Sequence, residues 1–301
     1  MTDDHLNTRL APLMLLGSST LFGVMSFLAK VVSEVIPGSE VAFVRFLVGI
    51  IPILLLTRAR NAAFTFQRVD ILFYRGFFGG VAVLCFFTAI AHIPVGVATL
   101  LNYMAPMFSG FFAAIFLDEP LTARVLVPLG VAFGGVILVV KAHAAPGEIL
   151  GFGIWHLVGL LSAVLSGAAV TAIRGARRTE NSWAIFGSFS LFGLLATLPV
   201  AAFEWHTPTL FQWMLLVGVA ALSIVAQLIM THAFRWVETL IAGVISQFTV
   251  VVAMTMGAIW LGEKITPLSL IGSLLTIGGV VSVVGFTPHK SAEDAELGRP
   301  G

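Results

Sequence analysis

The sequence predicts an all-α integral membrane protein with ten transmembrane helices, arranged as two inverted repeats of five helices each. Three observations lead to this prediction. Hydrophobic residues make up 58% of the 301 residues, charged residues only 10%, and the mean hydropathy is +1.02, whereas a soluble domain is about 25% charged. About ten apolar stretches each have roughly the 20 residues that a helix needs to cross the hydrocarbon core. The second five stretches repeat the first five at a constant offset of 144 residues.

The repeat is carried by charges, glycines and hydroxyls, which chance matching of leucines and valines does not explain. Leu117, Glu119 and Thr122 match Leu261, Glu263 and Thr266. Gly134, Gly135 and Val136 match Gly278, Gly279 and Val280. Ser18, Gly23 and Lys30 match Ser162, Gly167 and Arg174. An odd number of spans in each half makes the second copy enter the bilayer in the opposite sense. A two-fold axis in the membrane plane then relates the halves, as in secondary transporters. The predicted repeats cover 10–142 and 153–287, followed by a polar cytoplasmic tail, 288–301.

The predicted spans follow one another with short connectors. In chain order they are 10–32, 39–57, 71–91, 95–117, 125–141, 153–173, 183–203, 211–233, 239–261 and 267–286. The first is a membrane helix and not a cleavable signal peptide, because Asp3 and Asp4 precede it and no cleavage pattern follows it. The connectors and tails leave no room for a soluble catalytic domain. Cys85 is the single cysteine, which excludes an intramolecular disulfide.

The orientation follows from the distribution of Lys and Arg. With a cytoplasmic N-terminus, twelve of the 16 Lys and Arg residues fall on the inner side and four on the outer side. The positive-inside rule therefore predicts a multi-pass membrane protein with both termini in the cytoplasm. The alternative is that one or two of the spans are re-entrant, which would change the topology.

Ionisable side chains are rare inside the spans, where each is costly and functional by default. Arg45 lies about two turns into the second span. It either snorkels to the outer surface or pairs with Glu40, or it binds an anion near the outer mouth. His92, His156 and His232 fall near helix ends, so none is placed as a proton relay at mid-membrane. Downhill or weakly coupled transport fits this distribution better than a strongly proton-coupled pump.

The fourth span holds the main polar cluster. Pro106 has no N–H, so the carbonyl of Asn102 loses its helical partner, and the kinked helix offers that carbonyl beside the Tyr103 hydroxyl. The offset places Ser246 and Gln247 of the ninth span at equivalent positions, without the proline. The predicted substrate-binding residues of this cluster are Asn102, Tyr103, Ser246 and Gln247. The alternative is that they form interhelical hydrogen bonds that only hold the bundle together.

Aromatic side chains of the third span form a second candidate surface. Three glycines between positions 76 and 80 are expected to leave one face of this helix open, flanked by Tyr74, Phe77 and Phe78. A flat apolar substrate would fit such a face, so these three aromatic residues are also predicted to bind substrate. The alternative is that they are ordinary components of a membrane helix, in which Phe is common.

The fifth and tenth spans are rich in small residues and poor in polar ones. The fifth contains Gly130-x-x-x-Gly134, a pattern of close helix approach, and its Gly134-Gly135 pair matches Gly278-Gly279. We expect these two helices to lie at the periphery, where they brace each half or meet a neighbouring protomer. A monomer or a weak homo-oligomer is predicted.

The sequence contains no Walker loop, zinc-ligand spacing, nucleophile elbow or pair of catalytic carboxylates. It therefore predicts no catalytic residues, no cofactor and no metal site. The expected partners are the lipid bilayer and a small-molecule substrate, such as an amino acid or a related metabolite, and not a nucleic acid.

Two helix ends carry a family resemblance. The fourth span ends in Leu117-Asp-Glu-Pro-Leu-Thr122 and the ninth in Leu261-Gly-Glu-Lys-Ile-Thr266, and each is followed by a helix with a Gly-Gly pair. This pattern resembles the EamA type of the drug/metabolite transporter superfamily over about residues 10–287, and the chain is similar overall to bacterial aromatic amino-acid exporters. The resemblance implies a ten-helix carrier of the bacterial inner membrane, whose substrate cavity lies between helices 1–4 and 6–9, with helices 5 and 10 outside. The first half departs from the pattern at Asp118 and Pro120, which changes only a helix end.

Together these observations predict a secondary transporter that exports small neutral metabolites by alternating access without ATP, above all amino acids with aromatic or bulky apolar side chains. An anionic substrate would require cations in the cavity, and only Arg45 and Arg75 come close. A zwitterion is held by helix ends and free carbonyls. One alternative is export of cationic or hydrophobic drugs, which predicts a carboxylate in the cavity. From another class, the alternatives are a lipid scramblase or a membrane-embedded enzyme; the missing catalytic residues argue against the enzyme.

Overall fold

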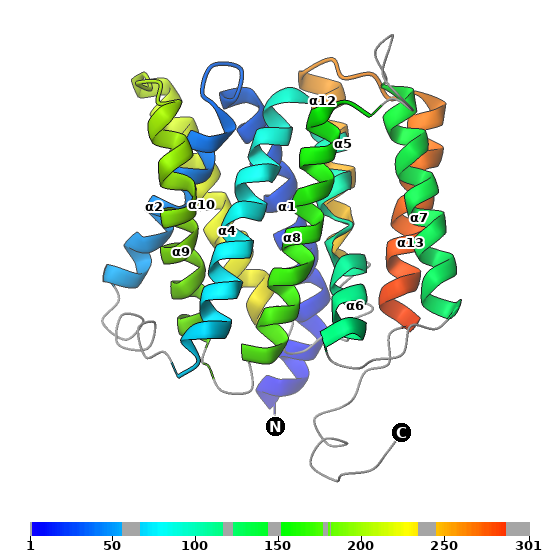
Figure 1. Cartoon of the computed structure of the whole chain (residues 1–301), viewed down its shortest axis with the longest axis horizontal. Helices are drawn as coiled ribbons and strands as arrows, with labels where there is room; N and C mark the ends of the chain where they lie inside the picture. Colours follow the sequence, from blue (N-terminus) through cyan, green and yellow to red (C-terminus); the bar gives the residue numbers. More distant parts are fainter. Residues whose placement is uncertain are drawn as a thin grey trace.

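The computed structural model describes residues 2–55, 67–116, 123–143, 152–176, 180, 182–233 and 245–286, and every regular element in these ranges is a helix. The helices stand side by side in one bundle (Figure 1). The first repeat contains α1 (Thr2–Val32), α2 (Gly38–Leu55), α4 (Val69–His92), α5 (Val95–Asn102), α6 (Ala105–Phe116) and α7 (Ala123–Ala142). The second contains α8 (Ile154–Ala176), α9 (Ser182–Phe203), α10 (Leu210–Ala233), α12 (Phe248–Trp260) and α13 (Pro267–Phe286).

The helices match the predicted spans. In the described part of the chain, α1, α2, α4, α8, α9 and α10 are long and apolar enough to cross a membrane, and α7, α12 and α13 contain shorter apolar segments. The fourth predicted span is α5 followed by α6, and the first part of the ninth, 239–244, lies outside the described residues. Proline marks two helix starts, since Pro94 precedes α5 and Pro267 begins α13, where its fixed φ suits the first turn. The all-helical membrane fold is confirmed.

The chain enters and leaves the bundle at one end. The start of α1 and the end of α13 lie together at the bottom of Figure 1, as an even number of crossings requires. The cytoplasmic location of this end remains a prediction. It rests on the distribution of Lys and Arg.

We expect single cysteines at Val35 and His206, in a Cys85→Ser background, to react with a membrane-impermeant maleimide in intact cells. Cysteines at Gln67 and His232 should react only after permeabilisation. All four positions are exposed in the structure, whereas the neighbouring Ile36 is only 1% exposed and would report poorly. Labelling at Gln67 in intact cells would reverse the orientation.

The two repeats meet around a pseudo-two-fold axis. The side-chain amide of Gln247 donates to the Tyr103 carbonyl at 3.3 Å, and the Thr276 hydroxyl donates to the Ala132 carbonyl at 3.3 Å. The residues of each pair are 144 positions apart, the offset of the repeat. A residue contacts its own repeat partner only close to the axis that relates the halves. The axis therefore passes both the α5–α6 junction and the contact between α7 and α13, as expected for inverted repeats.

Close glycine contacts join α7 to α13, which lie next to each other at one edge of the bundle (Figure 1). A Cβ on Gly135 would lie 2.5 Å from the Gly272 carbonyl oxygen, and one on Gly279 would lie 2.6 Å from the Pro128 carbonyl oxygen. Gly134, by contrast, has nothing within 4 Å of such an atom. Gly130 also faces open space, so the Gly130-x-x-x-Gly134 face makes no close helix contact within the described part of this chain. The two helices brace each other through the second glycine of each Gly-Gly pair.

The glycine-glutamate pair after α12 has a structural role. Gly262 adopts a φ of 65°, a conformation that glycine favours, and turns the chain back toward the bundle. The Glu263 carboxylate then accepts a hydrogen bond from the N–H of Val95, at 2.8 Å, in the first turn of α5. Lys30 supports the same connection by donating to the Ile93 carbonyl at 2.9 Å. The equivalent Glu119 lies outside the described residues.

Replacing Glu263 by alanine should lower the free energy of unfolding by about 1 kcal/mol, because the first turn of α5 loses an anionic acceptor at its positive end. Glu263→Gln keeps an acceptor oxygen, so its free energy of unfolding should fall by less than that of Glu263→Ala. Thermal unfolding of the purified protein measures both. Equal stability of Glu263→Ala and wild type would remove the capping role.

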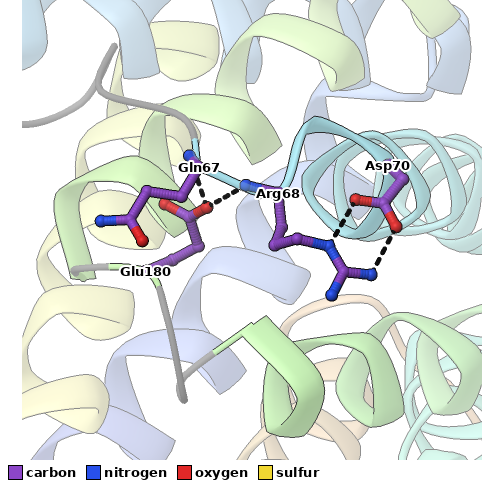
Figure 2. Close-up of polar contacts among 4 residues, drawn as sticks. All are labelled: Gln67, Arg68, Asp70 and Glu180. Carbon is purple, nitrogen blue, oxygen red and sulfur yellow. Dashed lines mark hydrogen bonds and ion pairs between the residues drawn. The ribbon is translucent and has the colours of Figure 1, made fainter.

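Two further carboxylates cap helix starts at long range. The buried Glu180 accepts hydrogen bonds from the N–H groups of Gln67 and Arg68, at 2.8 and 2.6 Å, just before α4 (Figure 2). Beside them, Arg68 forms an exposed bidentate pair with Asp70 (Figure 2), which contributes little to stability. Near the opposite end, the buried Glu40 accepts from the N–H of His206 at 3.0 Å, ahead of α10. These acids stabilise connections and are not placed at mid-span.

Candidate substrate site

The fourth span is interrupted at the predicted place. The last bond of α5 runs from the Tyr103 N–H to the Thr99 carbonyl at 2.9 Å, and α6 begins at Ala105. Pro106 offers no N–H to the Asn102 carbonyl, and the Met107 N–H donates to Met104 at 2.9 Å. Two successive carbonyls, those of Asn102 and Tyr103, therefore lack their helical partners. The predicted loss of helical hydrogen bonding at Asn102 is confirmed.

The ninth span is interrupted at the equivalent residue. Ile245 and Ser246 are helical, Gln247 forms a turn, and α12 begins at Phe248. The Val250 N–H reaches the Gln247 carbonyl at 3.0 Å, a bond over three residues and not four. Val250 stands where the first repeat has a proline, so the residues alone carried no signal for this second break.

The two interruptions meet at the pseudo-two-fold axis. Gln247 is only 3% exposed, and its amide satisfies the Tyr103 carbonyl that the broken helix leaves free. An unpaired carbonyl in hydrocarbon would be costly. Asn102 and Ser246, the preceding residues of the two repeats, are partly buried. We call these four residues, Asn102, Tyr103, Ser246 and Gln247, the axial polar cluster.

The predicted aromatic surface lies elsewhere. Tyr74 and Phe77 expose 54% and 41% of their surface, and Tyr74 stacks on Phe78 with ring centres 5.9 Å apart. The glycine face that we expected to be open is covered by α9, because a Cβ on Gly76 would lie 2.5 Å from the Ser188 carbonyl oxygen. The structure therefore does not join these aromatic residues to the axial polar cluster. Their role in binding substrate stays a prediction.

Arg45 adopts neither of the two structural arrangements expected for it. Its Nε donates to the Ser223 hydroxyl in the middle of α10, so the side chain runs into the bundle and not to the outer surface. Glu40 accepts from the His206 N–H instead of pairing with Arg45. The guanidinium carbon lies 5.5 Å from the centre of the Phe189 ring on α9.

A second arginine reaches the same ring. Arg75 of α4 is only 7% exposed, and its guanidinium carbon lies 4.1 Å from the Phe189 ring centre. Sequence reasoning placed Arg75 on the inner side and Arg45 near the outer mouth, so their meeting was missed. The available signal was two cations within apolar spans, but the partner ring on α9 depends on tertiary packing.

The family model for the EamA-like transporter family matches this chain twice, over residues 9–141 and 153–285. The two matches coincide with the two repeats.

Several transporters are similar in sequence to most of this chain. The pseudopaline exporter CntI of Pseudomonas aeruginosa is 31% identical over 267 residues, 88% of this chain and 93% of the relative. A probable terminal-alkyne amino-acid exporter of Streptantibioticus cattleyicolor is 31% identical over 69% of this chain and 70% of its own. An S-adenosylmethionine uptake transporter of Rickettsia bellii is 28% identical over 75% of each. One crystal structure shares the fold with a TM-score of 0.60 at 20% identity, over 92% of this chain and 97% of that one.

The duplicated helical unit, the axis between its copies and these matches agree with one another. The chain belongs to the EamA-like transporter family, within the drug/metabolite transporter superfamily, and is therefore a multi-pass transporter and not an enzyme.

Proposed function

We propose that this protein exports amino acids and related small metabolites by alternating access, with aromatic or bulky apolar side chains preferred. The observation that carries the proposal is the axial polar cluster, which lies where both repeats are interrupted at their common axis. Broken helices at a repeat interface supply the free carbonyls that hold polar substrate groups. Inverted repeats also provide two equivalent conformations that open to opposite sides.

The relatives support the chemistry and the direction. Two are named as exporters, one of pseudopaline and one of terminal-alkyne amino acids, and a third is named for uptake of S-adenosylmethionine. An amino-acid substrate with a non-polar side chain is consistent with the apolar walls of the spans.

Counterflow in proteoliposomes tests the proposal. Vesicles loaded with unlabelled L-phenylalanine, L-tryptophan or L-leucine should transiently accumulate the labelled form of the same amino acid. Vesicles loaded with a cationic dye should not. Exchange of the dye but of no amino acid would favour drug export, and movement of labelled lipid between leaflets would favour a scramblase.

We expect this exchange to need no ion gradient. In the described ranges, the buried carboxylates Glu40 and Glu180 cap helix starts, so neither is placed as a proton carrier at mid-membrane. Efflux should proceed down the substrate gradient at equal pH and without sodium. Accumulation driven by an imposed pH difference, and lost in His232→Ala, would contradict this expectation.

A further inference from the structure

We propose that Arg45 and Arg75, the arginine pair, form a carboxylate-binding subsite inside the bundle, so that the transported molecule carries a carboxylate group. This inference rests on the proposed function and deepens it, because it names the charged group that the transporter recognises. It differs from the axial polar cluster in its residues and in its chemistry.

The arginine pair is assembled from three helices. Arg45 comes from α2 and Arg75 from α4, and both lie beside the ring of Phe189 on α9, whose centre is 5.5 and 4.1 Å from the two guanidinium carbons. The helix α9 packs against both α2 and α4, and the three stand at one side of the bundle in Figure 1. A fourth helix, α10, contributes Ser223, which accepts a hydrogen bond from Arg45 Nε.

The pair is electrostatically incomplete. Both guanidinium groups lie against the same phenylalanine ring. The ion pair found within the described ranges, Arg68 with Asp70, lies elsewhere and involves neither arginine. The buried atoms Nη1 of Arg45 and Nε of Arg75 have no hydrogen-bond partner. Two like charges in a low-dielectric interior are costly, and buried charges are normally paired. An anion between them would remove both the repulsion and the unpaired donors.

A small cavity adjoins Arg45. It is lined by Arg45, Gly49, Phe189, Ser190 and Ser223, among others, and its volume of about 10 Å³ has room for one water-sized group. Gly49 keeps one wall open, since a Cβ there would meet only the Ser190 hydroxyl, at 3.5 Å. The cavity must widen to admit a larger ligand, as an alternating-access cycle provides.

The chemistry of the subsite favours a carboxylate. The guanidinium group is a planar fork of donors that matches the two oxygens of a carboxylate. Phe46 and Phe189 supply rings beside the charges, which suits a carboxylate attached to an apolar body. A free inorganic anion would satisfy the charges but would not use these rings.

Thermal unfolding of the full-length protein in detergent tests the subsite with defined probes. The acids tested are L-phenylalanine, L-leucine, L-glutamate and 3-phenylpropionate. Each acid is compared with its own primary amide, and inorganic phosphate is tested separately. At least one acid should raise the Tm at concentrations where its amide does not. Arg45→Gln and Arg75→Gln should each raise its half-saturating concentration about 10- to 100-fold, the loss expected for a hydrogen bond to a charged group. Arg75→Lys should retain part of the affinity.

Arg68→Gln is the matched control, because it removes an exposed arginine whose side chain pairs with Asp70 outside the core. It should leave the half-saturating concentration unchanged. Amides that bind as tightly as acids, acids that bind equally well to the two glutamine variants, or no binding of any acid would each overturn the subsite. Stabilisation by phosphate alone would assign the pair to an inorganic anion and would also overturn it.

A second measurement separates a binding role from a purely structural one. Replacing one arginine by methionine removes the repulsion between the guanidinium groups while keeping most of the volume. The Tm of the empty protein should stay the same or rise, and the shift caused by the acid should disappear. A lower Tm with an unchanged shift would assign the arginines to packing around Phe189.

The failure of this inference is distinguishable from failure of the proposed function. If an acid such as L-glutamate binds through the arginine pair while no aromatic or bulky apolar amino acid exchanges in counterflow, the subsite stands and the proposed side-chain preference fails. If aromatic amino acids exchange equally well in wild type and in Arg75→Gln, the proposed function stands and the subsite fails.

Discussion

Replacing Gln247 by alanine should lower transport at least about tenfold per folded molecule, equivalent to about 1.4 kcal/mol of substrate stabilisation. The free energy of unfolding should fall by only about 0.6 kcal/mol, the usual cost of an interhelical hydrogen bond in a membrane. The reason is that Gln247 holds the Tyr103 carbonyl at the axis where both repeats are interrupted. Asn102→Ala should act in the same direction. Counterflow divided by the folded fraction measures the effect.

Thr276→Val is a matched control for this experiment. The Thr276 hydroxyl also lies 3.3 Å from the carbonyl of its own repeat partner, Ala132, but between α13 and α7, and it shares its proton with the Gly272 carbonyl of its own helix at 2.8 Å. Its loss should cost similar stability and leave flux per folded molecule unchanged. If Gln247→Ala behaves in the same way as Thr276→Val, the axial polar cluster only holds helices together.

Gly135→Ala should lower the free energy of unfolding by about 1–3 kcal/mol, the cost of overpacking a close contact. The added methyl group would lie 2.5 Å from the Gly272 carbonyl oxygen and 2.6 Å from the Thr276 nitrogen. Both are backbone atoms of α13, which cannot rotate away as the end of a side chain can. The two helices, α7 and α13, must therefore separate. Gly279→Ala in the second repeat should behave alike, because its methyl would meet the Pro128 carbonyl oxygen at 2.6 Å.

The neighbouring glycines provide controls one residue away. A Cβ on Gly134 or Gly278 would have nothing within 4 Å. Alanine at either position should raise the free energy of unfolding by less than about 1 kcal/mol, because alanine has a higher helix propensity than glycine. Thermal unfolding of the four single variants measures both effects. Equal destabilisation by Gly134→Ala and Gly135→Ala would contradict the described packing of α7 on α13.

Part of the candidate site was predictable from residue chemistry. Pro106 lacks an N–H, so the break after Asn102 follows from covalent structure alone. The offset then identifies Gln247 as the partner of Tyr103, and the structure joins these two residues. The break at Gln247 itself was not predictable, since Val250 is compatible with a continuous helix. In the structure the Ser19 hydroxyl of α1, in the opposing repeat, donates to the Ile245 carbonyl at 3.2 Å, just before this break.

Predictions that depended on the direction of a side chain were less successful. The positions of three glycines in the third span identified a glycine face. They did not indicate that α9 covers this face or that Tyr74 and Phe77 point away from the bundle. Arg45 was expected to snorkel or to pair with Glu40, and it reaches Ser223 instead. A long flexible side chain takes the direction that its neighbours leave open, and those neighbours belong to other spans.

The sequence by itself determined the membrane environment, the positions of the spans and the inverted repeat. These properties follow from the transfer of apolar side chains into lipid and from the obligation of each span to satisfy its own backbone. Tertiary structure alone decided which glycine of each Gly-Gly pair is in contact, that Gln247 meets Tyr103, and that Arg45 and Arg75 share one phenylalanine ring. The physical reason is that the rotation of a helix about its own axis is set by packing against all of its neighbours at once, which no single span encodes.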